Sequence, residues 1–241
     1  MKIELVNQDL KKLINLLHVR EINMDVSSMY LYYLLNEANS IKEKNVLNYV
    51  KKRNLSLDRA FYYEFLNVLE LDYKDPDFIL ANKTCRIQNI KELKIDKYIN
   101  NPYYRMIKVP ETTSESWYFK YDTIEAYEGF MYKDLEVIPN ENYAEISSLG
   151  FFSHPYKYLS VTQGDEIWMC VTPHEMETME ASIEEARGNV LVFGLGLGYY
   201  PFMISRKSNV NKITIIEKDK KVNRLHFGEK MQENREESED A

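Results

Sequence analysis

Apolar residues recur at steps of three and four along the first third of the chain, first over residues 10–17 and again after residues 27–28. This spacing is typical of helices that bury one face. Ser40 and Ser56 are placed to cap a third and a fourth helix. We therefore expect residues 1–104 to be mainly helical. The positions expected on buried helix faces are Leu10, Leu13, Ile14, Leu17, Leu31, Leu34, Leu35, Val46, Leu47, Val50, Phe61, Phe65, Val68 and Leu69.

From residue 105 to residue 171 the pattern changes to aromatic and β-branched residues, which favour strands. The clearest runs cover residues 117–121, 130–138 and 156–171. Within the last run, Gln163-Gly164-Asp165 separates two apolar halves and predicts a hairpin turn. We expect a small antiparallel β region over residues 105–171.

A helix start follows at Thr172-Pro-His-Glu175. Thr172 is placed to cap, the proline occupies the first helical position, and Glu175 can bond back to the cap amide. We expect this helix to end at Ala186, with Gly188 just beyond it as the C-cap.

Four of the 8 glycines in the chain lie between positions 188 and 198. Residues 190–193 are wholly apolar, as in a buried parallel strand. After that strand, Gly194 suits a tight turn, Gly196 leaves the backbone open to a ligand, and Gly198 can open a helix whose amides face that ligand.

Residues 212–216 predict a second strand, and Glu217 stands at its end. A strand, a glycine turn, a helix, a strand and an acid in this order predict the opening of a nucleotide-binding α/β unit. In such a unit the Glu217 carboxylate would accept the ribose hydroxyls.

The glycine spacing separates two ligand classes. A dinucleotide fingerprint requires a glycine at position 199, where this chain has Tyr199. The G-x-G-x-G form instead resembles motif I of the class I S-adenosylmethionine-dependent methyltransferases. The resemblance implies a Rossmann-like domain over residues 172–220, with S-adenosylmethionine as cofactor. It assigns cofactor binding to Gly194, Gly196, Gly198 and Glu217.

The order of a β-rich region, a short helix and the glycines is loosely similar to the spermidine synthase branch of that superfamily. The Asp-Glu-x-x-Tyr-His-Glu signature of the branch is not present, and His174-Glu175 is only an echo of it. We therefore carry over the architecture and not the aminopropyl transfer.

A cofactor domain of this class has about seven strands, whereas residues 218–241 alone follow Glu217. Residues 221–241 are mostly polar and acidic, and we expect them to be a disordered tail. The sequence therefore predicts an incomplete cofactor domain, whether truncated, frameshifted or split. It also predicts weak or absent cofactor binding, an exposed edge at the second strand, and no assignable catalytic residue or methyl acceptor.

The composition is ordinary for a globular protein, with 44% hydrophobic and 29% charged residues. The net charge of −7 disfavours nucleic acid as a partner. We expect no membrane span, because no apolar run approaches about 20 residues. Cys85 and Cys170 lie far apart and predict two reduced thiols in a cytoplasmic protein. A homo-oligomer is left open.

Other candidates have weaker support. Asp219 could share the role of Glu217, and His174 could lie near a substrate, although both fit surface positions. The histidines and cysteines have no metal-ligand spacing. The 19 tyrosines favour packing over a stacking surface for bases. Two alternative functions remain, a nicotinamide-binding Rossmann protein and a non-catalytic interaction module formed by residues 1–187.

Overall fold

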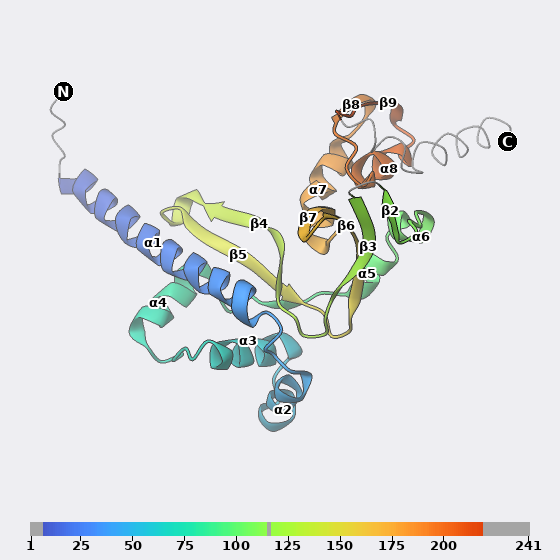
Figure 1. The fold of residues 1–241 in the computed structure, drawn as a ribbon. Coiled ribbons are helices and arrows are strands. Elements are labelled where there is room, and N and C mark those ends of the chain that lie inside the picture. The colour runs from blue at the N-terminus through green and yellow to red at the C-terminus, as the bar shows by residue number, and fades with distance from the viewer. Residues whose placement is uncertain (1–6, 115–116, 219–241) are drawn as a thin grey trace. The chain divides into compact units, whose positions relative to one another are not determined.

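The structure is a computed structural model that describes residues 7–114 and 117–218. The chain is a mixed α/β protein, as the sequence predicts, and it divides into two compact units (Figure 1). Unit 1 combines Met1–Lys94 with Ile124–Tyr156, and unit 2 combines Ile95–Thr123 with Lys157–Ala241. Each unit is therefore assembled from two chain segments. The domain boundaries predicted from sequence at residues 105 and 172 stay predictions.

Unit 1 contains the helices of the first third of the chain. The Ser56 side chain accepts a hydrogen bond from the Arg59 amide and caps the helix that follows, as predicted. Asp75 caps the next helix in the same way, through the amides of Asp77 and Phe78. The helices of unit 1 are α1 (Asn7–Tyr32), which continues as a π-helical segment (Tyr33–Glu37), α2 (Glu43–Arg53), α3 (Leu57–Val68) and α4 (Pro76–Cys85).

Two expectations about the helix ends are wrong. Ser40 does not cap α2, because Lys42 is the N-cap residue and the Ser40 hydroxyl donates to the Glu37 carboxylate instead. The chain also does not break at Ser27 and Ser28. Both serines lie on the exposed surface of a continuous α1, where they do not compete for the helix backbone bonds.

The expected buried face of the first helix is also wrong. The four residues expected there are exposed, whereas Ile22, Val26 and Tyr30 form the buried face in the second half of α1. The expectation of burial is also wrong for Leu31 and Leu35, which are exposed. The reason is tertiary, since the α1 residues that belong to the core cluster of unit 1 all lie in that second half. There the buried Asn23 side chain donates to the Tyr143 carbonyl and accepts from the Glu145 amide.

The sheet of unit 1 has the order β1-β5-β4, from β1 (Lys91–Glu92), β5 (Ala144–Phe151) and β4 (Phe130–Ile138). β4 and β5 are antiparallel, and a 3₁₀ turn (Pro139–Glu141) lies between them. The core joins this sheet to α3, where the rings of Phe61 and Phe151 stack 4.0 Å apart. Cys85 is buried beneath α1, and both cysteines are free thiols, as predicted.

Unit 2 begins with two short helices, α5 (Ile95–Ile99) and α6 (Pro102–Met106), and a sheet of order β2-β3-β6-β7. The predicted hairpin at Gln163–Asp165 joins β6 and β7, with Gly164 at a φ of +61°. The strands expected as one antiparallel region thus divide between the sheets of the two units. The strands of this sheet are β2 (Thr112–Ser114), β3 (Trp117–Ile124), β6 (Tyr156–Gln163) and β7 (Glu166–Cys170).

The remainder of unit 2 is α7 (Pro173–Glu185), β8 (Gly188–Phe193), α8 (Tyr199–Ser205) and β9 (Val210–Ile216). Thr172 caps α7 by accepting from the Glu175 amide, as predicted. Gly188 is not the C-cap, because α7 ends at Glu185 with Ala186 as C-cap and Gly188 already pairs with Val210 as the first residue of β8. β8 and β9 are parallel neighbours, and the chain passes between them through α8.

The β8–β9 pair is covered on one face only. Val190, Val192, Ile213 and Ile215 belong to a core cluster with Ile204 of α8. On the opposite face Leu191, Phe193 and Ile216 are exposed. The apolar run therefore forms the strand that was predicted, but the expectation that the strand is fully buried is wrong for the described residues.

Candidate functional site

The three glycines after β8 form a loop that only residues with unusual backbone freedom can follow. Gly194, Gly196 and Gly198 have φ values of +83°, +55° and +75°. Side chains are strained in this left-handed region. Among the residues that the structure describes, no atom lies within 4 Å of a Cβ built on Gly194, and only Met169, at 3.9 Å, approaches one built on Gly196. The backbone conformation therefore explains these glycines, and the described residues leave the space beside Gly194 open.

The structure brings Glu217 to this loop. Phe193 and Ile216 are the last partners in the parallel register, so the chain leaves both strands at the same edge. The Gly194 amide donates to the Ile216 carbonyl at 2.8 Å. The Glu217 carboxylate accepts from the Leu195 amide at 2.7 Å. All four cofactor residues predicted from sequence thus lie together, with a carboxylate bonded to the loop backbone.

The residues that anchor the glycine loop to the rest of unit 2 were not predicted from the sequence. The buried Tyr103 hydroxyl of α6 donates to the Leu197 carbonyl at 2.5 Å. The Tyr103 ring packs edge-on against Tyr199 at 5.4 Å and against Phe202 at 5.7 Å. Asn101, which caps α6, also donates to the Tyr199 hydroxyl at 3.0 Å. One sequence signal near these residues was Asn101-Pro102. It is a capping residue followed by proline, as at Thr172-Pro173, and it indicates the start of a helix.

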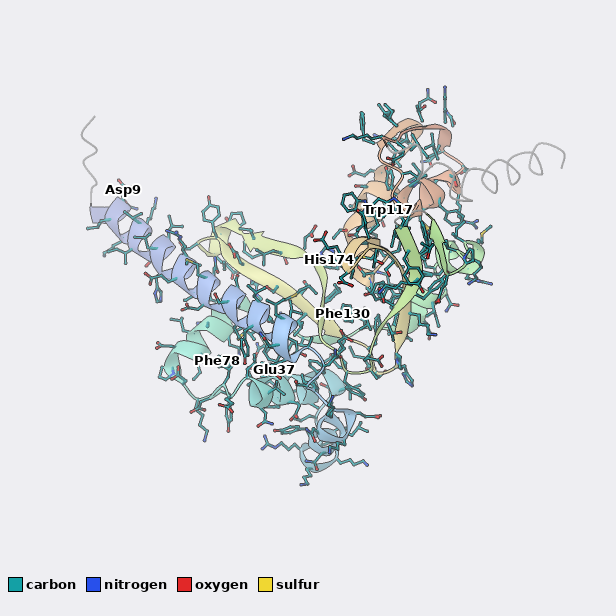
Figure 2. All side chains as sticks on the ribbon, viewed as in Figure 1. Asp9, Glu37, Phe78, Trp117, Phe130 and His174 are labelled. Atoms are coloured by element: carbon teal, nitrogen blue, oxygen red, sulfur yellow. The ribbon has the colours of Figure 1, made fainter. Side chains whose placement is uncertain are left out.

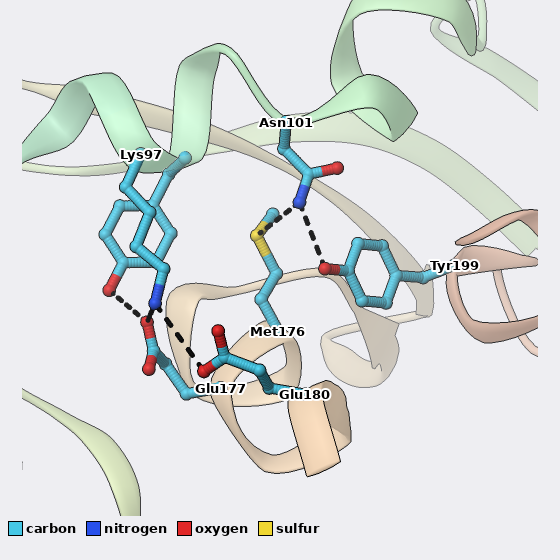
Figure 3. Close-up of polar contacts among 7 residues, drawn as sticks. Lys97, Asn101, Met176, Glu177, Glu180 and Tyr199 are labelled. Atoms are coloured by element: carbon cyan, nitrogen blue, oxygen red, sulfur yellow. Dashed lines mark hydrogen bonds and ion pairs between the residues drawn. The ribbon is translucent and has the colours of Figure 1, made fainter. Parts of the chain in front are cut away.

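A cleft of about 240 Å³ lies beside this anchor, between α5, α7 and α8. Figure 3 shows its polar contacts. The Glu177 carboxylate, with only 5% of its side chain exposed, accepts from Lys97 Nζ at 2.6 Å and from the Tyr98 hydroxyl at 2.8 Å. Lys97 also lies 3.7 Å from Glu180. Within unit 2, one lysine thus pairs with two carboxylates at this cleft, and the group of three side chains keeps a net negative charge.

Two of these groups have shifted acidities. Burial raises the pKa of Tyr199, and the bond from Asn101 offsets only part of that increase. For Lys97, burial lowers the pKa, but the hydrogen bonds and charges of Glu177 and Glu180 outweigh it and leave the pKa raised. At neutral pH, therefore, Tyr199 is a neutral hydroxyl and Lys97 a fixed cation.

The other two candidates from the sequence have no established role. His174 lies in the first turn of α7, and Asp219 lies outside the described residues. Residues 7–114 and 117–218 hold no cluster of three or more His, Cys, Asp or Glu side chains that could ligate a metal ion. In the same part of the chain, no helix combines the length and the apolar character that a membrane crossing requires.

Comparison with known proteins adds no relative, because scans of protein-family models, curated proteins and solved structures find no match to the chain. The interpretation of the glycine loop therefore depends on its residues and geometry alone.

The anchor gives a direct prediction. We expect Tyr103→Phe to destabilise unit 2 by about 1–3 kcal/mol, because the buried Leu197 carbonyl loses its donor while the ring packing stays. Hydrogen exchange of the 195–205 segment should report the loss. Tyr118→Phe is the matched control, because the Tyr118 side chain is 41% exposed. Equal exchange in the two variants would contradict an anchoring role.

Proposed function

We propose that unit 2 binds S-adenosylmethionine at the loop of Gly194, Gly196 and Gly198, and that the protein is methyltransferase-like. The observation that carries the proposal is the Glu217 carboxylate at the end of β9, bonded to a loop of three left-handed glycines at the end of β8. We further propose that β8, α8 and β9 are the first strand-helix-strand unit of a Rossmann-like sheet. In such sheets, ligands bind where the parallel strands end.

The residues present fit a nucleoside ligand. The open space beside Gly194 admits a ligand against the backbone. Glu217 is held at the loop by the Leu195 amide, and a carboxylate has lone pairs for more than one donor, so it can also receive the ribose hydroxyls. When bound, the cofactor would supply an activated methyl group. The chain would contribute position and electrostatics, and the methyl acceptor stays unassigned.

Calorimetric titration of the full chain tests the proposal. We expect weak binding of S-adenosylmethionine, in line with the prediction from sequence, and a still weaker response with NADH, because position 199 holds a tyrosine where a dinucleotide fingerprint has glycine. Tighter binding of NADH would favour the nicotinamide alternative. No binding of either ligand would contradict the proposed site.

A substitution at Glu217 separates the contribution of the carboxylate charge to binding from its contribution to the loop structure. Glu217→Gln keeps an oxygen that can accept from the Leu195 amide but removes the charge. We expect affinity for S-adenosylmethionine to fall by about 10- to 100-fold, as for the loss of a hydrogen bond to a charged group. Glu185→Gln, at an exposed residue that ends α7, is the matched control. Equal affinities for both variants would rule out ribose recognition by Glu217.

The interaction-module alternative cannot be tested by deleting the chain after Gly188. That deletion would remove α8, whose Tyr199 and Phe202 pack on the buried Tyr103 ring within unit 2. Unit 2 would lose part of its core, and any loss of partner binding would be uninformative. Point substitutions on exposed residues are the appropriate tool.

A further inference from the structure

The first half of α1 presents apolar side chains that unit 1 does not cover. Every residue from Gln8 to Asn15 is exposed. Asp9 marks this end of α1 in Figure 2, and the helix extends past the β4–β5 hairpin of the same unit in Figure 1. These apolar side chains span about two turns of the helix, and contiguous exposed apolar surface marks an interaction site more often than scattered apolar residues do. The exposed side chains are Leu10 (45%), Leu13 (40%), Ile14 (56%) and Leu17 (46%).

The spacing of these residues is that of a helix–helix seam. Leu10, Ile14 and Leu17 follow each other at steps of four and three, which is the repeat of a coiled coil with leucine at d and isoleucine at a. The next position of the repeat is Glu21, so the apolar seam ends there. A short seam with a charge at its end fits another helix of similar length rather than a broad apolar surface.

The two ends of this segment of α1 carry opposite net charge, so the segment is complementary to a second copy of itself that runs antiparallel. Lys11 and Lys12 outweigh Asp9 at the first end, whereas Glu21 and Asp25 outweigh Arg20 at the other, and all six side chains are exposed. In an antiparallel pair centred between Ile14 and Leu17, Lys11 lies beside the seam and approaches Glu21 of the other helix, whereas Lys12 faces away from the seam. The two helix dipoles then also oppose each other favourably.

We propose that the exposed half of α1 pairs antiparallel with the same segment of a second copy of this chain. The contact is isologous, since a two-fold axis through the seam places Ile14 against Leu17 of the second copy and Leu17 against Ile14. This surface lies in unit 1 and does not depend on the cofactor assignment in unit 2.

Sedimentation of the full chain over a concentration series tests the pairing. We expect a dimer that Ile14→Glu weakens by about tenfold or more, because the seam would then enclose two unpaired carboxylates. Leu35→Glu is the control, since Leu35 is 74% exposed but lies outside the seam. A wild-type chain that stays monomeric would overturn the proposal and leave the stripe to another occupant. A dimer unaffected by Ile14→Glu would also overturn it.

Charge reversal tests the orientation. The variant Lys11→Glu should weaken the dimer by repelling Glu21 of the second copy, whereas Lys12→Glu, on the side of α1 away from the seam, is the matched control. Adding Glu21→Lys to the Lys11→Glu chain should restore the dimer. Circular dichroism checks that α1 stays helical in each variant. Failure of Glu21→Lys to restore a dimer that Lys11→Glu weakens would overturn the antiparallel arrangement.

Discussion

Replacing Phe61 by alanine is expected to destabilise unit 1 by about 3–5 kcal/mol, the usual cost of removing a fully buried ring. Phe61 has no exposed surface and stacks on Phe151 at 4.0 Å with an interplanar angle of 10°. Phe151 is equally buried and stacks in turn on Tyr127 at 5.8 Å. The substitution therefore opens a cavity where α3 meets β5, and the two elements come from separate segments of the chain.

Hydrogen exchange measures the loss of stability in each of the two units separately. Amides of α3 and β5 should lose protection in Phe61→Ala, while those of β8 and β9 serve as an internal reference in unit 2. Ile79→Ala on α4 is the surface control, because Ile79 is 51% exposed and its truncation should cost less than about 0.5 kcal/mol. Equal loss of protection in the two variants would show that the α3–β5 stack does not hold the unit together.

Several local signals in the sequence predicted local structure correctly, although the caps expected at Ser40 and Gly188 are wrong. Ser56 and Thr172 cap the helices they precede, and Gly164 occupies the predicted hairpin. Each of these features depends on residues within a few positions of one another. The same locality explains the strand, glycine turn, helix and strand that bring Gly194 and Glu217 together, because a parallel register follows once both strands exist.

Features that depend on distant partners could not be predicted in the same way. The periodicity of residues 10–17 is real, but which helix face is buried depends on where α4 and β5 lie, and they meet the second half of α1. The anchoring of the loop by Tyr103 is another case. The Tyr103 hydroxyl donates to a carbonyl 94 positions further along the chain. No local pattern distinguishes Tyr103 from the other 18 of the 19 tyrosines.

Burial of several tyrosines makes the stability of the protein depend on pH in the alkaline range. Burial raises the pKa of Tyr30, Tyr33 and Tyr103 well above the usual range, and burial raises the pKa of the Cys85 thiol to about 11. In every case the folded protein favours the protonated form, while the unfolded chain ionises at the ordinary values of 10.0 for tyrosine and 9.0 for cysteine. The stability from these groups is therefore complete below those ordinary values.

As the pH rises above 10, the unfolded chain releases protons that the folded protein keeps, and we expect unfolding in alkali. Each buried tyrosine costs about 1.4 kcal/mol of stability per pH unit until its folded pKa is reached. Unit 1 holds Tyr30 and Tyr33 and should lose about 3 kcal/mol per unit from them, whereas unit 2 loses about half as much from Tyr103. Unit 1 should therefore be the first to unfold if the two units start from equal stability.

Tyrosinate absorbance and circular dichroism, followed together during an alkaline titration, check this expectation. The buried tyrosines should ionise only as helical signal is lost, because their ionisation is coupled to unfolding. Tyr33→Phe removes one such group, so the stability of unit 1 should fall by about 1.4 kcal/mol less per pH unit than in the wild type. Ionisation of all tyrosines near their ordinary pKa with the helical signal intact would contradict the burial of these rings, and with it the packing of α1 on the core of unit 1.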